Sequence, residues 1–181
     1  MPKAKRPLQR GEPEALLRKA ITAREKALVV LLWRGGLRSN EACNVRCEDF
    51  EIQRDKTIKL HIVVGKGGKQ RHIGFGHVYA KYIRKQLSGR KTGYFLCTRH
   101  GTPIITQQVR RTIHFLGQRA NIADRVHPHK LRHCYARDLH DEKYSVEEIR
   151  LALGHNNLGT TQIYLESIGL DAVVDKLTTR D

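Results

Sequence analysis

One stretch of strict alternation constrains the fold more than any other feature of this chain. Apolar residues occupy every second position before a glycine-rich turn: Ile58, Leu60, Ile62 and Val64. This period of two is the pattern of a strand with one buried face. Gly65-Lys66-Gly67-Gly68 then predicts a turn, and Arg71-His72-Ile73 predicts the returning strand. The sequence therefore predicts a small antiparallel sheet.

The segments on both sides of this hairpin carry helix signals. Thr22 and Glu25 form a capping-box pattern before an apolar run that Gly35-Gly36 ends. We also expect helices over residues 39–46, 78–87, 107–119, 129–141 and 145–154, and two short ones over 159–165 and 171–177. The predicted fold class is α+β, mostly α-helical, with the small sheet near the front of a single domain. That domain is expected over residues 12–181, after a loose basic arm over residues 1–11.

The charge of the chain indicates a polyanionic partner. There are 34 Lys and Arg residues against 18 Asp and Glu residues, a net charge of +16. An excess of this size favours nucleic acid as the partner. Aromatic residues make up only 6% of the chain, so an RNA-binding surface built on ring stacking is disfavoured.

Neither a membrane nor a metal is indicated. The longest apolar run, from Ala27 to Trp33, is far shorter than the roughly 20 residues that a membrane span requires. The four cysteines form no Cys-x-x-Cys pair, so we expect reduced thiols, a cytoplasmic protein and no zinc site. No carboxylate cluster suited to divalent metal ions appears, and no cofactor is expected.

The last third of the chain collects groups suited to phosphate chemistry. His129 and Arg132 are one helical turn apart and share a face that His133 continues. His155 follows Gly154 at an expected helix end, and Tyr164 follows nine residues later. A buried tyrosine is usually structural, but cations and a proton acceptor near a phenol would make it a nucleophile.

The first third supplies further candidates. Arg38 precedes Glu41 at an expected helix start, where backbone N–H groups favour an anion. Lys66 is at the tip of the glycine-flanked hairpin, where a large anion can approach the backbone. Lys69 and Arg71 flank the tip and are expected to contact DNA phosphates.

Together these segments resemble the catalytic domain of the tyrosine recombinases, the phage integrase family. The motifs that carry the resemblance are Gly36-Leu37-Arg38-x-x-Glu41, Gly65-Lys66-Gly67-x-Lys69-x-Arg71, His129-x-Leu131-Arg132-His133, Leu153-Gly154-His155 and Thr160-Thr161-Gln162-Ile163-Tyr164. Each motif is weak alone, but five in order and in register, from about residue 12 to residue 178, are highly specific.

The resemblance implies a role for each residue. Tyr164 would attack a DNA phosphate, His129 would accept its proton, and Lys66 would protonate the departing 5′ oxygen. The residues that would grip the phosphate are Arg38, Arg132 and His155, with Glu41 and His133 in support. The reaction would cut and rejoin DNA through a covalent 3′-phosphotyrosine intermediate.

The resemblance also implies double-stranded DNA as partner and a tetramer on DNA, in which residues 165–181 would either dock on a neighbouring subunit or pack on their own domain. The core-binding domain that usually precedes this one is expected to be absent, so we expect weak DNA binding by this chain alone. Two alternatives remain open, namely relaxation of DNA in the manner of a type IB topoisomerase and DNA binding without catalysis.

Overall fold

The computed structural model describes residues 7–64 and 69–154. Its contacts divide the chain into two units, residues 1–135 and 136–181, and the boundary falls within helix α6. Among the described residues, no helix is long and apolar enough to cross a membrane.

Unit 1 is mostly helical, as predicted. Its helices are α1 (Glu12–Lys19), α2 (Ala23–Trp33), α3 (Ser39–Asn44), α4 (His77–Leu87), α5 (Thr106–Arg119) and the first part of α6 (Pro128–Asp141), with a short 3-10 helix over Cys47–Asp49. Unit 2 contains the remainder of α6 and α7 (Val146–Leu153). The two short helices expected over residues 159–165 and 171–177 lie outside the described residues.

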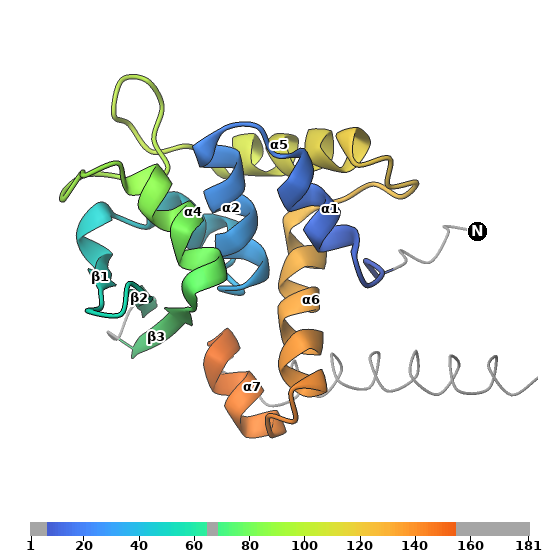
Figure 1. The fold of residues 1–181 in the computed structure, drawn as a ribbon. Coiled ribbons are helices and arrows are strands. Elements are labelled where there is room, and N and C mark those ends of the chain that lie inside the picture. Colours follow the sequence, from blue (N-terminus) through green and yellow to red (C-terminus); the bar gives the residue numbers. More distant parts are fainter. Residues whose placement is uncertain (1–6, 65–68, 155–181) are drawn as a thin grey trace, which may run out of the picture. The chain divides into compact units, whose positions relative to one another are not determined.

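Helix α2 is the centre of unit 1. Every residue from Ala27 to Trp33 is buried, because this part of the helix is apolar on all sides and α2 packs against α1, α3, α4 and α5. Its start has the predicted capping box, in which the Glu25 N–H donates to the Thr22 hydroxyl at 3.1 Å. Figure 1 shows α2 beside α4.

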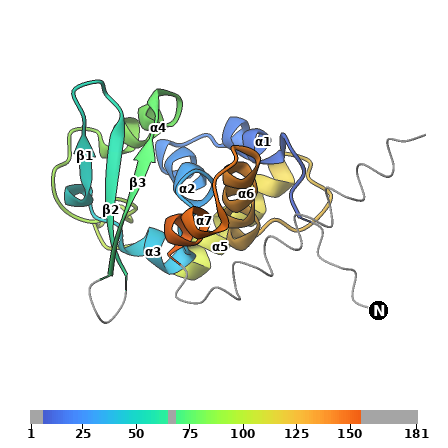
Figure 2. The same cartoon turned by 90° about the horizontal axis from the view of Figure 1, so that it is seen from below.

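The predicted antiparallel sheet is present and has three strands. They are β1 (Phe50–Ile52), β2 (Ile58–Val64) and β3 (Lys69–Phe75), hydrogen-bonded in the order β1-β2-β3. Figure 2 shows them side by side. The alternating positions Ile58, Leu60 and Ile62 are buried, and Ile62 pairs with Arg71 across β2 and β3.

The N-terminal part differs from the sequence analysis in two respects. Helix α1 was not predicted, and Leu8, inside the expected loose arm, is only 1% exposed and belongs to the core. Helix α1 buries Leu16 and Leu17, and it packs against α2 and α5. A helix of eight residues is marginal in isolation, so this packing is what stabilises it.

Candidate active site

One carboxylate organises a cluster of arginines in unit 1. Both terminal nitrogens of Arg71 donate to Glu41, Nη1 to Oε1 at 3.0 Å and Nη2 to Oε2 at 2.7 Å. Arg38 donates its Nη1 to Oε1 at 3.0 Å and its backbone N–H to Oε2 at 2.8 Å. Arg132 Nη1 lies 3.9 Å from Oε2. Residues from α3, β3 and α6 thereby meet at Glu41.

Local structure explains how Arg38 and Glu41 come together. Arg38 is the N-cap of α3 and Glu41 is its third helical residue, which points back at the N-cap N–H. The Arg38 side chain is 43% exposed, whereas those of Arg71 and Arg132 are 7% and 3% exposed. Of these three arginines, Arg38 is therefore the one most open to an incoming anion.

The glycine pair that ends α2 also holds Arg132. Arg132 Nη1 donates a hydrogen bond to the carbonyl oxygen of Gly36. Gly36 has a φ of +58°, and a Cβ atom there would lie 2.2 Å from Cδ1 of Tyr135. Only glycine fits this left-handed position under the Tyr135 ring. The turn therefore fixes the position of the Gly36 carbonyl oxygen to which Arg132 donates.

His129 lies near these arginines in a form suited to accepting a proton. Burial lowers the pKa of His129 below its ordinary value of 6.5, and the charges of Arg132 and Arg38 lower it further. The ring is therefore neutral at neutral pH. The rings of His129 and His133 are 4.5 Å apart, as expected for one helical turn.

Glu41 is charged despite being largely buried. Burial alone would raise the pKa of Glu41, but hydrogen bonds and charge from Arg71, the Arg38 N–H and the charge of Arg132 outweigh it and hold the pKa below its usual value. Three arginines around one carboxylate leave a positive excess, so the cluster can bind an anion with several oxygens, such as a phosphate.

The structure brings together five of the expected site residues: Arg38, Glu41, His129, Arg132 and His133. Arg71, expected to contact DNA, instead points into the protein and pairs with Glu41. Lys69 begins β3 opposite Val64. Lys66, His155 and Tyr164 lie outside the described residues.

Two contacts in this site were not predicted, namely the close approach of Gly36 to Tyr135 and the hydrogen bond from Arg132 to the Gly36 carbonyl. Gly36 belongs to a motif of the sequence, but the motif does not show which residues pack against it. The inward direction of Arg71 had a signal, because Arg71, Ile73 and Phe75 are alternate positions of one strand and so share a face.

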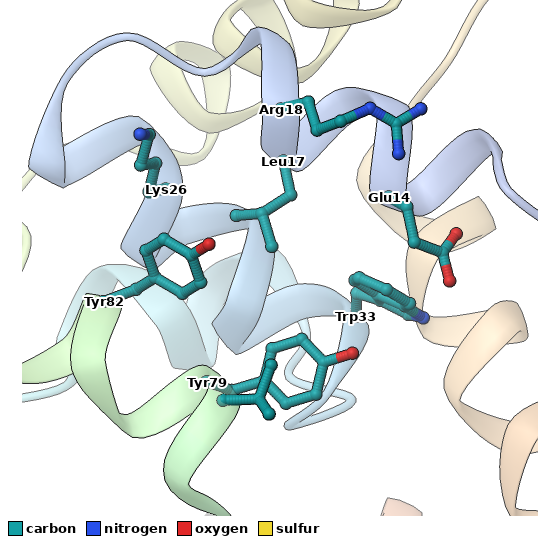
Figure 3. A pocket seen from close by; sticks show the side chains of 8 residues that line it. Glu14, Leu17, Arg18, Lys26, Trp33, Tyr79 and Tyr82 are labelled. Atoms are coloured by element: carbon teal, nitrogen blue, oxygen red, sulfur yellow. The ribbon is translucent and has the colours of Figure 1, made fainter.

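A pocket of about 380 Å³ lies elsewhere in unit 1, between α1, α2 and α4 (Figure 3). The residues that line it are Glu14, Leu17, Arg18, Lys26, Trp33, Val78, Tyr79 and Tyr82. The Arg34 guanidinium lies 4.4 Å from the Trp33 ring centroid and 4.7 Å from that of Tyr79. Arg34 also donates to the Tyr79 hydroxyl at 2.8 Å. Two aromatic rings that line the pocket, those of Trp33 and Tyr79, therefore already have a cationic partner within the protein.

Comparison with known proteins points to one family. The model of the phage integrase family matches residues 8–168. The tyrosine recombinase XerC of Bacillus subtilis is 32% identical over 151 residues, which are 78% of this chain and 48% of that protein. The tyrosine recombinase XerA of Thermococcus kodakarensis is 35% identical over 146 residues, 78% of this chain and 50% of that protein. The chain thus spans about half the length of these relatives.

Solved structures show the same fold. A crystal structure of XerA recombinase superposes with a TM-score of 0.83 at 26% identity, covering 97% of this chain and 66% of that one. A pre-cleavage complex of the XerH site-specific recombinase with its difH substrate superposes with a TM-score of 0.75 at 23% identity, covering 87% of this chain and 49% of that one. The expected fold class, a mostly helical domain with a small antiparallel sheet, is therefore confirmed.

Proposed function

Because the chain belongs to the phage integrase family of tyrosine recombinases, we propose that it acts as a site-specific DNA recombinase. The Tyr164 hydroxyl attacks the phosphorus of a DNA phosphodiester, and the bond from phosphorus to the 5′ oxygen breaks. The products are a 3′-phosphotyrosine and a free 5′ hydroxyl. The reverse attack by a 5′ hydroxyl rejoins a strand, and no nucleotide is consumed because the phosphotyrosine keeps the bond energy.

The observation that carries this proposal is the cluster around Glu41. Attack on a phosphodiester builds negative charge on the non-bridging oxygens, and fixed cations stabilise that charge most strongly in the transition state. Arg38 and Arg132 are cations of this kind, and the contacts of Glu41 and of the Gly36 carbonyl restrict their positions. Removing one such donor typically costs on the order of 10²–10³ in rate.

Proton transfer is assigned to three further residues. Neutral His129 accepts the tyrosine proton, with His133 in support, and Lys66 protonates the departing 5′ oxygen. A positioned acid or base contributes roughly 10²–10⁴ in rate. His155 joins the two arginines on the phosphate. The lowered pKa of His129 supports its assignment, since an imidazolium could not accept a proton.

The partner follows from the charge and from the relatives. A net charge of +16 suits double-stranded DNA, and the XerH structure and that of the Tn1549 transposon integrase are complexes with DNA. We propose that Lys69 contacts a DNA phosphate beside the site, and that the chain assembles as a tetramer on DNA.

A trapping experiment tests this function and selects the DNA site in the same step. The chain is incubated with a duplex library that has randomised arms around a nicked core, and protein–DNA adducts that survive denaturation are isolated and sequenced. The nick lets the short cleaved product diffuse away, so the adduct accumulates. We expect an adduct with the wild-type chain and enrichment of one duplex sequence.

The substitutions then assign the nucleophile. Tyr164→Phe must abolish the adduct, whereas Tyr144→Phe, which alters an exposed tyrosine, must leave it unchanged. An adduct that survives Tyr164→Phe would reveal another nucleophile, and binding without any adduct would indicate a DNA-binding module. Relaxation of supercoiled plasmid without two-site recombination would favour a topoisomerase-like activity.

A further inference from the structure

We propose that Arg71 is a positioning residue of the active site, which holds the Glu41 carboxylate from strand β3 and thereby keeps Arg38 and Arg132 in place for the phosphate. This role rests on the proposed function, since it concerns the same reaction. It differs from the phosphate contact that the sequence predicted for Arg71.

The contacts of Glu41 show how the carboxylate is fixed. Its two oxygens offer about four acceptor positions. Arg71 fills one position on each oxygen, and Arg38 fills another on each, through its side chain and its backbone N–H. Arg132 Nη1, at 3.9 Å, is beyond hydrogen-bond distance from the same carboxylate and binds the Gly36 carbonyl instead. A carboxylate with all four positions filled has no capacity left to draw Arg132 away.

Arg71 also offsets the charge of Glu41. A lone carboxylate beside Arg38 and Arg132 would compete with a phosphate for both arginines and would repel it. The forked pairing with Arg71 neutralises Glu41 from the side opposite to solvent, because the Arg71 side chain is only 7% exposed. The single negative charge of Glu41 is thereby shared among three arginines, and a net positive charge remains beside Arg38 and Arg132.

The same burial speaks against a direct contact between Arg71 and DNA. Both terminal nitrogens of Arg71 are on Glu41, and its Nε is buried with no hydrogen-bond partner in the described part of the chain. The backbone of Arg71 is fixed as well, since it pairs with Ile62 in the sheet. Arg71 is thus anchored on a regular strand, which positions a side chain more precisely than a loop does.

The test compares variants on the duplex selected by adduct formation. Arg71→Gln removes the charge and the two-pronged hydrogen bonding to Glu41, whereas Arg71→Lys keeps the charge alone. Glu41→Gln and the double variant Arg71→Gln/Glu41→Gln complete a double-mutant cycle. The matched control is Arg46→Gln, which breaks an exposed pair with Glu48 at 2.6 Å. Each variant is measured for DNA affinity, for the salt dependence of that affinity, and for the rate of adduct formation at saturating protein.

A positioning role predicts a split between binding and chemistry. For Arg71→Gln we expect the adduct rate at saturation to fall by about 10- to 100-fold, because a misplacement of about 1 Å can cost that much. Affinity and salt slope should equal those of the wild type, and Arg71→Lys should recover part of the rate. In the Arg71→Gln background, Glu41→Gln should cause no further loss, and the control should behave as the wild type.

Other results would overturn the role. A salt slope reduced by about one with an unchanged saturated rate would make Arg71 a phosphate contact. Rate losses that multiply in the double variant would mean that Arg71 does not act through Glu41. If Trp33 fluorescence shows that Arg71→Gln is unfolded, Arg71→Lys decides, since a folded variant with the wild-type rate refutes the role. Failure of the wild-type chain to form an adduct would instead refute the proposed function.

Discussion

Replacing Gly36 by alanine should destabilise unit 1 by more than the cost of its left-handed backbone conformation alone. The φ of +58° places an alanine in the left-handed region, which costs about 1–2 kcal/mol. The added Cβ would also lie 2.2 Å from Cδ1 and 2.8 Å from Cε1 of Tyr135, so the ring or the turn must move. Overpacking of this kind costs typically about 1–3 kcal/mol. We therefore expect a loss of about 2–5 kcal/mol, the sum of the two costs.

A second glycine provides the control for strain. Gly101 has a φ of +79° and would place its Cβ in open space, so Gly101→Ala should cost only about 1–2 kcal/mol. Urea unfolding followed by the fluorescence of Trp33, the single tryptophan, reports on unit 1, where that residue is 1% exposed. A shift of the midpoint at constant slope gives the change in free energy of unfolding.

The contact with Tyr135 is separable from the strain. Tyr135→Ala removes the ring, so the double variant with Gly36→Ala should lose less stability than the sum of the two single variants. If Gly36→Ala were no worse than Gly101→Ala, or if the two changes were additive, the close approach of Gly36 and Tyr135 would not be the cause. The same substitution moves the carbonyl that binds Arg132, so the adduct rate should fall with it.

Three further outcomes are expected. Thr22→Ala removes the hydroxyl that caps α2 and should cost about 1 kcal/mol in the urea assay, whereas Thr22→Ser should cost less. Because folding lowers the pKa of His129, stability should decrease as pH falls below 6.5 towards that lower pKa, and His129→Gln should remove this part of the pH dependence. An equal pH dependence in both proteins would contradict the burial of the ring. Affinity for duplex DNA, followed by fluorescence anisotropy, should fall steeply as salt rises, and a flat response would exclude binding dominated by phosphates.

Periodicity predicted most of this fold because it reports directly on burial. The alternation from Ile58 predicted β2. The helix expected over residues 107–119 is α5, and its apolar stripe of Val109, Ile113 and Leu116 is fully buried. Helix α1 was missed although it carries the usual helix signals, since Pro13 and Glu14 lie in its first turn and Arg18 and Lys19 in its last. With eight residues it is marginal in isolation, and its packing against α2 and α5 stabilises it.

The candidate site residues fall into two groups, those suggested by their residue type and one whose role depends on strand register. Arg38, His129 and Arg132 were candidates because phosphate chemistry uses cations and a proton acceptor, and the family resemblance implied a role for each. Arg71 was assigned to DNA because, in a strongly basic chain, an arginine beside a hairpin tip suggests a phosphate contact. Its strand register favours another role, since it shares a face with Ile73 and Phe75, which are 3% and 2% exposed. An arginine on a buried face requires an acidic partner, and Glu41, 30 positions away, is that partner. The number of cations favours a polyanionic partner, whereas strand register determines which of those cations face into the protein and which face outward.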